Sequence, residues 1–219
     1  MIRILICDDH RIVREGLKQI LADATDMQVV AEAASGPEAL MQVAQLQGDS
    51  TASGGLDVVL LDIALPERDG LDVLQYLKQH YPRLPVLMLS TYPEKQYAVR
   101  CLKLGAAGYL NKSADPDDML AAVRKVAAGG VFVTPSTGEA LASAVSGKQG
   151  GKAGPEALSH REHQVFRLLT QGLSVSEIGA QLKIAANTVS TYRARILEKT
   201  GTKNDVELAL YAQQYANSH

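Results

Sequence analysis

The first 130 residues alternate between two patterns of hydrophobic and polar positions. Short, almost wholly apolar runs are typical of strands buried on both faces, and they lie at residues 3–7, 28–33, 57–61, 86–89 and 108–110. Between these runs the apolar residues recur at spacings of three and four, which predicts amphipathic helices. Alternation of strands and helices favours a parallel sheet with helices on both faces. We therefore expect an α/β, doubly wound (βα)5 domain.

The pattern changes near the end of the chain, where it is helical throughout. Ser159 with Glu162, and Ser174 with Glu177, have the spacing of capping boxes, so each pair predicts the start of a helix. Gly172 between them suits a tight turn. The sequence thus predicts a second, smaller all-α domain.

A change in composition separates the two patterns. Residues 143–159, "SAVSGKQGGKAGPEALS", are rich in Gly, Ser, Ala and Lys and have no sustained apolar period, which predicts a flexible linker. We place the first domain at residues 1–130, the linker at 131–156 and the second domain at 157–219. A Gly- and Ser-rich stretch at residues 47–55 is expected to be a surface loop within the first domain.

Composition and charge narrow the possible functions. No apolar run approaches the roughly 18 residues of a membrane span, and the N-terminal residues do not have the pattern of a secretory signal. The two cysteines form no metal or redox motif, so we expect a reduced, cytoplasmic protein. Residues 1–140 contain 13 Lys and Arg against 18 Asp and Glu, whereas residues 141–219 contain 9 against 6. The two halves are expected to meet different partners.

Polar residues stand at the ends of four predicted strands. Asp8 and Asp9 follow the first, Asp62 the third, Ser90 the fourth and Lys112 the fifth. Functional groups in a parallel sheet collect at the carboxyl ends of the strands, so these side chains should lie close together in one site at that edge. A carboxylate at the end of a buried strand also needs a compensating partner, which Asp62 would find there.

This group of side chains predicts a particular chemistry. Clustered carboxylates repel one another and stay ionised beside a cation, and oxygen ligands favour Mg²⁺. A carboxylate can then act as a nucleophile toward phosphorus, while Lys112 neutralises charge on the transferring oxygens and Ser90 bonds one of them. Taken singly, Asp8 and Asp9 are as well explained as a solvated loop pair, Lys112 as a surface charge and Ser90 as an ordinary strand-end hydroxyl. Asp62 is less easily explained in this way, because a charge at the end of a buried strand needs a partner. An aspartate-nucleophile phosphatase would need a second acid at position 64, which holds Ala64.

The stretches "CDDHRIVREGL", "LLDIALPERDG", "LMLST" and "GAAGYLNK" resemble the receiver domain of bacterial two-component response regulators, a flavodoxin-like fold, across residues 1–130. The resemblance implies that Asp62 is the phosphoacceptor and that Mg²⁺ is bound by Asp8, Asp9, Asp62 and the backbone carbonyl of Ala64. It also implies that Ser90 is the switch hydroxyl, Tyr109 the switch aromatic and Lys112 the lysine of the phosphate site. Alone, Tyr109 would be taken for a packing aromatic. The chain departs from the pattern at Arg11, where proline is usual, and in its longer loop before the third strand.

The segment "AANTVSTYRARILEK" predicts a helix with two different faces. At 100° per residue, Val189, Tyr192 and Ile196 share one face. The small polar residues opposite suit a DNA major groove, with basic side chains for phosphates nearby. The predicted DNA-binding residues are Asn187, Thr188, Ser190, Thr191, Arg193, Ala194, Arg195, Lys199 and Lys203.

Residues 158–215 resemble the LuxR-type helix-turn-helix domain, through the motif "LSHRE…LLTQGLSVSEIGAQLKIAANTVSTYRARILEKTG". The resemblance implies that Ser190, Thr191 and Ala194 face bases and that a fourth helix, residues 204–215, contributes to a dimer contact. The chain has Ala185 where a capping serine is common, and Tyr192 where histidine is common. His160 and His163 are expected on an exposed first turn without a role.

Together the two resemblances indicate a response regulator of the NarL/FixJ type. They imply phosphorylation of Asp62 by a sensor histidine kinase, binding of double-stranded promoter DNA and a homodimer when phosphorylated, without membrane contact. We expect no enzymatic activity beyond the protein's own phosphorylation and dephosphorylation. Two alternatives remain open: an atypical receiver controlled by a ligand or a protein partner, and a regulator that acts by protein contact rather than on DNA.

Overall fold

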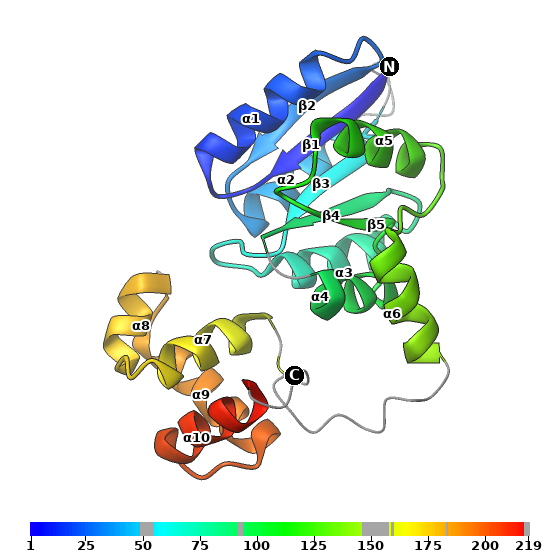
Figure 1. Cartoon of the computed structure of the whole chain (residues 1–219). Coiled ribbons are helices and arrows are strands. Elements are labelled where there is room, and N and C mark those ends of the chain that lie inside the picture. Colours follow the sequence, from blue (N-terminus) through cyan, green and yellow to red (C-terminus); the bar gives the residue numbers. More distant parts are fainter. Residues whose placement is uncertain (49–54, 92–93, 146–157, 159, 183, 217–219) are drawn as a thin grey trace. The chain divides into compact units, whose positions relative to one another are not determined.

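The computed structural model describes residues 1–48, 55–91, 94–145, 158, 160–182 and 184–216 (Figure 1). The chain divides into two compact units, Met1–Lys148 and Gln149–His219.

A parallel sheet forms the centre of the first unit. Within the described residues its strands have the order β2-β1-β3-β4-β5, and every neighbouring pair is parallel. All residues of β3 and β4 are buried, because these strands lie inside the sheet and are covered on both faces. The strands are β1 (Ile2–Cys7), β2 (Met27–Ala33), β3 (Val58–Asp62), β4 (Val86–Ser90) and β5 (Gly108–Asn111).

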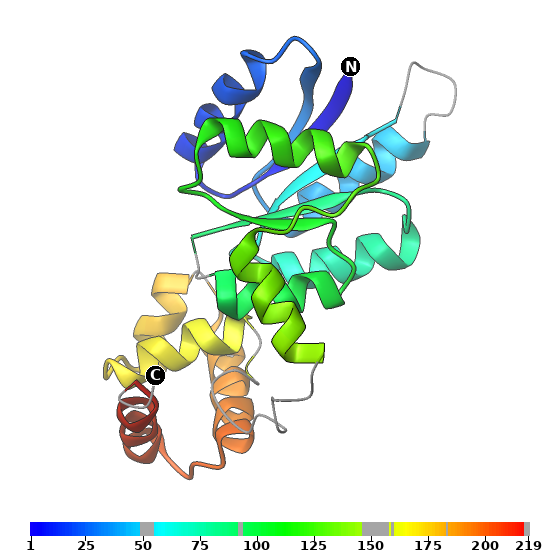
Figure 2. The ribbon, with the colours of Figure 1, turned by 45° about the vertical axis from the view of Figure 1, so that its right-hand side comes forward.

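Helices cover both faces of this sheet. One apolar cluster joins the sheet to α1 (Arg11–Ala22) and α5 (Pro116–Ala127). A second cluster joins the opposite face to α2 (Gly36–Gly48), α3 (Gly70–His80) and α4 (Glu94–Lys103). Figure 2 shows α5 in front of the sheet, with α3 and α4 behind its lower edge. The doubly wound α/β fold predicted from the sequence is confirmed.

A further helix, which was not predicted from the sequence, follows α5. It is α6 (Pro135–Val145), which packs on α4 and lies within residues 131–156, the interval we assigned to the linker. Its sequence, "PSTGEALASAV", contains a glycine and mostly small residues, so it has no strong apolar stripe. Residues 146–156 of that interval lie outside the described residues.

The described part of the second unit consists of helices around a small apolar core. The helices are α7 (His160–Thr170), α8 (Val175–Leu182), α9 (Ala186–Thr200) and α10 (Asp205–Ala216). Each contributes to the core, which contains the predicted buried residues Val189 and Ile196 of α9. Helices of the described residues are all too short or too polar to cross a membrane.

Local contacts set the start of α8 and the turn that follows it. The capping box of Ser174 and Glu177 is confirmed: the Glu177 amide donates to Ser174 Oγ at 3.3 Å, and the Ser174 amide donates to Glu177 Oε2 at 2.8 Å. The box at Ser159 lies outside the described residues. A Cβ on Gly179 would approach the carbonyl oxygen of Ile184 to 2.9 Å, so glycine permits the close turn between α8 and α9.

Candidate functional site

The carboxyl edge of the sheet brings together side chains from four strand ends. Asp62 is the last residue of β3 and Ser90 the last of β4, while Asp8 directly follows β1 and Lys112 directly follows β5. Asp8, Asp62 and Ser90 are all buried. The predicted convergence of these strand ends is therefore present in the structure.

Lys112 is the cation of this group. Its Nζ lies 2.6 Å from Asp8 Oδ2 and 2.8 Å from Asp62 Oδ2. The backbone amide of Lys112 continues the β4–β5 ladder by donating to the Ser90 carbonyl at 2.9 Å, which fixes where its side chain starts. The charge at the end of the buried β3 strand is thus compensated by an ammonium group from a strand two positions away in the sheet.

Burial and charge act in opposite directions on the ionisation of this group. Burial raises the pKa of Asp62, and Lys112 opposes that effect. Burial lowers the pKa of Lys112, but the neighbouring carboxylates outweigh burial and leave this pKa above its ordinary value. Lys112 is therefore held in its charged form.

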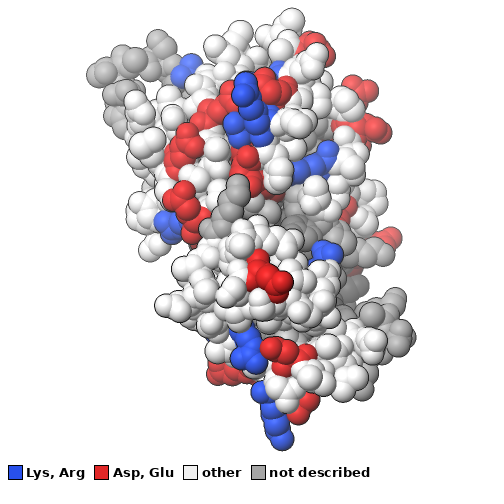
Figure 3. Space-filling view, turned by 90° about the vertical axis from the view of Figure 1, so that its left-hand side faces the viewer, with Lys and Arg blue, Asp and Glu red and all other residues white. Residues whose placement is uncertain are grey.

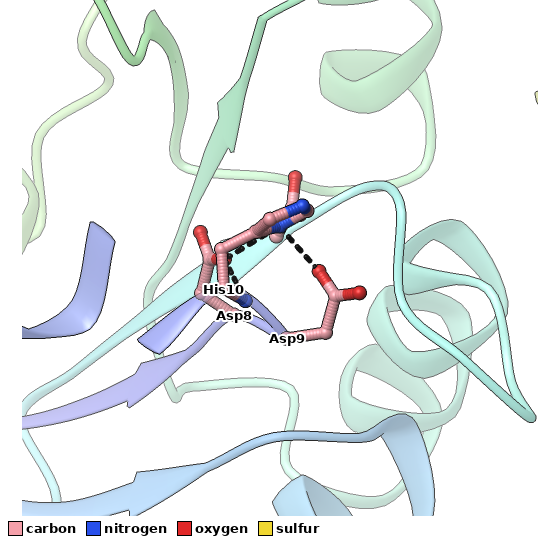
Figure 4. Close-up of side chains that lie close together, drawn as sticks. Asp8, Asp9 and His10 are labelled. Atoms are coloured by element: carbon pink, nitrogen blue, oxygen red, sulfur yellow. Dashed lines mark hydrogen bonds and ion pairs between the residues drawn. The ribbon is translucent and has the colours of Figure 1, made fainter. Parts of the chain in front are cut away.

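Asp9 and His10 extend the acidic group toward solvent. Figure 4 shows the His10 ring beside both acids, with Nδ1 2.7 Å from Asp9 Oδ1 and 3.5 Å from Asp8 Oδ1. Ligand atoms of Asp8, Asp9, His10 and Asp62 all lie within 4.8 Å of one another. This acidic pocket has the oxygen donors that a Mg²⁺ site uses. His10 is not among the site residues predicted from the sequence, although it directly follows the two acids.

Two further predicted residues contact this group. The backbone amide of Ala64 hydrogen-bonds the Asp62 carboxylate, whereas the role assigned to the carbonyl of Ala64 stays a prediction. Tyr109 is buried and its side chain hydrogen-bonds that of Ser90. Burial raises the pKa of the Tyr109 hydroxyl, so it remains a neutral phenol. The Ser90 hydroxyl is therefore engaged by the aromatic that the sequence analysis paired with it.

In the second unit, α9 presents most of the predicted DNA-binding residues to solvent. Arg193 is the half-buried exception. Thr191 is exposed, but its hydroxyl donates to the Asn187 carbonyl at 3.0 Å. The exposed residues are Asn187, Thr188, Ser190, Thr191, Ala194, Arg195, Lys199 and Lys203.

Two of the predicted cations form ion pairs inside this unit. Arg193 Nε lies 2.8 Å from Asp205 Oδ1 at the start of α10, and Lys199 Nζ lies 2.6 Å from the buried Glu162 of α7. Both pairs join residues far apart in the sequence, which no local pattern reveals. Part of the positive charge expected for DNA is therefore already balanced by acids of the same unit.

The expectation that His163 lies on an exposed turn is wrong. Its side chain is half-buried beside the ring of Phe166, with 5.9 Å between ring centroids. Burial lowers the pKa of His163, and Arg167 lowers it further. The first turn of α7 packs against the core, which an isolated helical pattern did not reveal. The side chain of His160 lies outside the described part of the structure.

Each of the two units matches a known protein family. The response regulator receiver domain family matches residues 4–124, and the luxR family of bacterial regulatory proteins matches residues 156–212. The chain therefore belongs to the two-component response regulators of the NarL/FixJ family, with a receiver and a DNA-binding helix-turn-helix domain. This is a family of transcription regulators, not of enzymes.

Relatives match over nearly the full length. The chain is 41% identical to the transcriptional regulatory protein UhpA of Escherichia coli K12, over 95% of this chain and 96% of that protein. It is 36% identical to the response regulator GacA of Pseudomonas viridiflava, over 98% and 97%. Among solved structures, RcsB of Salmonella enterica serovar Typhimurium bound to promoter rprA with the phosphomimetic BeF3− has a TM-score of 0.61, at 25% identity and coverage of 96% and 97%.

Proposed function

We propose that Asp62 accepts a phosphoryl group from a sensor histidine kinase and that the resulting acyl phosphate controls binding of promoter DNA. The observation that carries this proposal is the buried Asp62 carboxylate, held with Asp8 by the single ammonium of Lys112 at the carboxyl edge of the sheet. Such a carboxylate can act as a nucleophile beside a fixed positive charge.

The acidic pocket also suits Mg²⁺. Asp8, Asp9 and Asp62 would hold the ion, together with the backbone carbonyl of Ala64. The donor set supports this assignment, because carboxylate oxygens from separate segments lie within 4.8 Å of one another and His10 is the one nitrogen donor among them. Bound Mg²⁺ supplies positive charge that reduces repulsion between the acids and the incoming phosphate.

In the transfer, a carboxylate oxygen of Asp62 forms the new bond to phosphorus while the bond from phosphorus to the histidine nitrogen of the kinase breaks. Lys112 neutralises charge on the phosphoryl oxygens. The Ser90 hydroxyl is assigned to bond one of these oxygens; in the structure it hydrogen-bonds Tyr109. A phosphoryl group that draws Ser90 away would therefore change the contacts of Tyr109 and shift the population of receiver conformations.

The outer face of α9 is the surface we assign to the major groove, with Ser190, Thr191 and Ala194 toward bases. Arg193, Arg195, Lys199 and Lys203 are assigned to phosphates, and Asn187 and Thr188 to the helix start near the DNA. RcsB supports this assignment, since its structures include a complex with promoter rprA and two dimers bound to two parallel DNAs. We propose a homodimer that binds two half-sites about one helical turn apart, in the cytoplasm where DNA is accessible.

The test is selection of genomic DNA fragments by the purified protein, with and without acetyl phosphate and Mg²⁺. Wild type is compared with Asp62→Ala and with Asp72→Ala, a control that removes an exposed acid of α3. We expect the phosphodonor to sharpen binding to a two-fold symmetric site in wild type and Asp72→Ala but not in Asp62→Ala. Equal binding by all three proteins in both conditions would point to control by a ligand or a protein partner.

A further inference from the structure

Arg14 of α1 contacts the backbone of the acidic pocket. Its Nη1 donates to the backbone carbonyl oxygen of Asp8 at 2.7 Å, and its Nε donates to Glu32 Oε2 of β2 at 3.1 Å. The Arg14 side chain is 15% exposed, so this is a partly buried contact. Neither the metal site nor the phosphoryl-transfer step proposed above uses Arg14.

The carbonyl that Arg14 holds belongs to the peptide between the two acids. The Asp8 amide makes a last ladder bond, to the Ala33 carbonyl at 3.1 Å, and the chain then leaves the sheet. Because the peptide unit is planar, fixing the Asp8 carbonyl also fixes the Asp9 amide in the same plane. That plane fixes the N–Cα bond of Asp9, about which its side chain is oriented.

Arg14 is itself held in place by a second charged contact. Glu32 accepts from Arg14 and also from Lys18, whose Nζ lies 2.7 Å from Glu32 Oε1. The planar guanidinium can donate in two directions at once, to a carbonyl and to a carboxylate, which an ammonium cannot do with the same geometry. Arg14 therefore connects the end of β1 to β2 beside the acidic pocket.

We propose that Arg14 is a positioning residue for the Mg²⁺ site, because it orients the peptide that joins Asp8 to Asp9. The inference rests on the proposed function, in which these two acids bind Mg²⁺. Contacts that orient metal ligands without touching the metal commonly change metal affinity by about 10- to 100-fold when removed.

The charge of Arg14 and its hydrogen bond to the Asp8 carbonyl predict opposite changes in Mg²⁺ affinity when Arg14 is replaced. A cation near a Mg²⁺ site repels the ion, so removing its charge should strengthen Mg²⁺ binding if electrostatics alone acted. Loss of the hydrogen bond to the Asp8 carbonyl should weaken it. Arg11 is an exposed arginine at the start of the same helix, three residues after Asp8 in the sequence, and Arg11→Gln removes the same charge. Comparison of Arg14→Gln with Arg11→Gln therefore separates the effect of the lost hydrogen bond from the effect of the lost charge.

The experiment is isothermal titration of Mg²⁺ into the full chain, for wild type, Arg14→Gln, Arg14→Lys, Arg11→Gln and Asp8→Asn. We expect Arg14→Gln to raise the Kd about tenfold. Arg14→Lys should also weaken binding although it keeps the charge, and Arg11→Gln should leave the Kd unchanged or lower it. The rate of phosphorylation by acetyl phosphate in Arg14→Gln should recover at saturating Mg²⁺, because the reacting groups are intact.

The role of Arg14 and the Mg²⁺ site itself can be contradicted separately. If Arg14→Gln and Arg14→Lys bind Mg²⁺ as wild type does, Arg14 does not position the site. If wild type binds no Mg²⁺, or Asp8→Asn binds it equally well, the proposed metal site is wrong. A purely structural role for Arg14 would lower the melting temperature without changing the Kd of the folded protein. If Arg14→Gln does not fold, Glu32→Gln tests the same contact, with a smaller expected rise in Kd.

Discussion

At the scale of single residues, the pocket is defined by an imbalance of charge. Lys112 is one ammonium between the carboxylates of Asp8 and Asp62, and Asp9 adds a third acid at the rim. Removing one member of a buried ion pair is costly because the remaining charge is left without its partner. The acidic pocket therefore has an excess of negative charge, which favours binding of a further cation.

Lys112→Met should therefore destabilise the first unit. Without Mg²⁺ we expect the free energy of unfolding to fall by about 3 to 5 kcal/mol, since two buried carboxylates are left facing each other. Added Mg²⁺ should restore part of that stability. The measurement is urea unfolding in EDTA and in Mg²⁺, with Lys103→Met, an exposed lysine of α4, as the control. An identical destabilisation in both solutions would contradict the proposed cation site.

Gly70 is the second residue on which the geometry of the pocket depends. A Cβ at this position would lie 2.0 Å from the carbonyl oxygen of Asp62, so a larger residue must push β3 and the start of α3 apart. We expect Gly70→Ala to cost about 1 to 3 kcal/mol of unfolding free energy and to slow phosphorylation of Asp62.

Gly16 provides the matched comparison for Gly70→Ala. It lies within α1, where a Cβ would have no neighbour within 4 Å. Gly16→Ala should raise the unfolding free energy by about 0.5 to 1 kcal/mol, because alanine favours a helix interior. Both changes are measured by thermal or urea unfolding, and a similar effect of the two would contradict the role of close approach at Gly70.

At the scale of elements, α6 depends on a carboxylate of another helix. Glu94, in the first turn of α4, accepts hydrogen bonds from the hydroxyls of Thr134, Ser136 and Thr137, which lie at the start of α6. Hydrogen bonds to a charged group are typically stronger than those between neutral groups. The contact fixes α6 against α4 although α6 itself has a weak apolar stripe.

Glu94→Ala should therefore loosen α6. We expect amide hydrogen exchange over residues 135–145 to become faster by at least about tenfold, which corresponds to about 1.4 kcal/mol of opening free energy. Glu139→Ala removes an exposed acid from α6 itself and serves as the control. If the two variants exchange equally fast, the hydroxyl contacts to Glu94 do not hold the helix.

The ion pairs of α9 make a second prediction at this scale. Arg195 is exposed, whereas Lys199 is paired with the buried Glu162. Arg195→Ala should reduce the slope of log binding constant against log salt by about 1 for each DNA phosphate that Arg195 neutralises. Lys199→Ala should change this slope less and destabilise the second unit more, because it removes an ion-pair partner of a buried acid. The two readouts are salt-dependent DNA binding and urea unfolding, and the reverse order of effects would contradict the assignment.

At the scale of the whole molecule, charge is divided between the two halves of the chain. The balance is −5 over residues 1–140 and +3 over residues 141–219. Figure 3 faces the side that lies on the left of Figure 1; most of this face is uncharged, and its charged side chains are more often Asp and Glu than Lys and Arg. The predicted difference in partners fits a family in which one domain is a receiver and the other binds DNA.

The order and type of the elements were largely predictable from the sequence. Each end of every strand lies within one residue of its predicted position, because a strand buried on both faces must be apolar along its whole length. Asp62 was recognisable as a functional candidate for the same reason, since it is the charge that ends such a strand. By contrast α6 was missed, because it has a weak apolar stripe of its own and its hydrogen bonds to Glu94 join residues 40 to 43 positions apart in the sequence.

The sequence by itself therefore determined the two domains, the parallel sheet and the group of side chains at its carboxyl edge, because each depends on local periodicity and on where strands end. The tertiary structure alone decided the partners: Lys112 between Asp8 and Asp62, Arg14 on the Asp8 carbonyl, and Lys199 with Glu162. These contacts join residues from different elements of the fold. Their distances follow from how the elements pack, which no local pattern specifies.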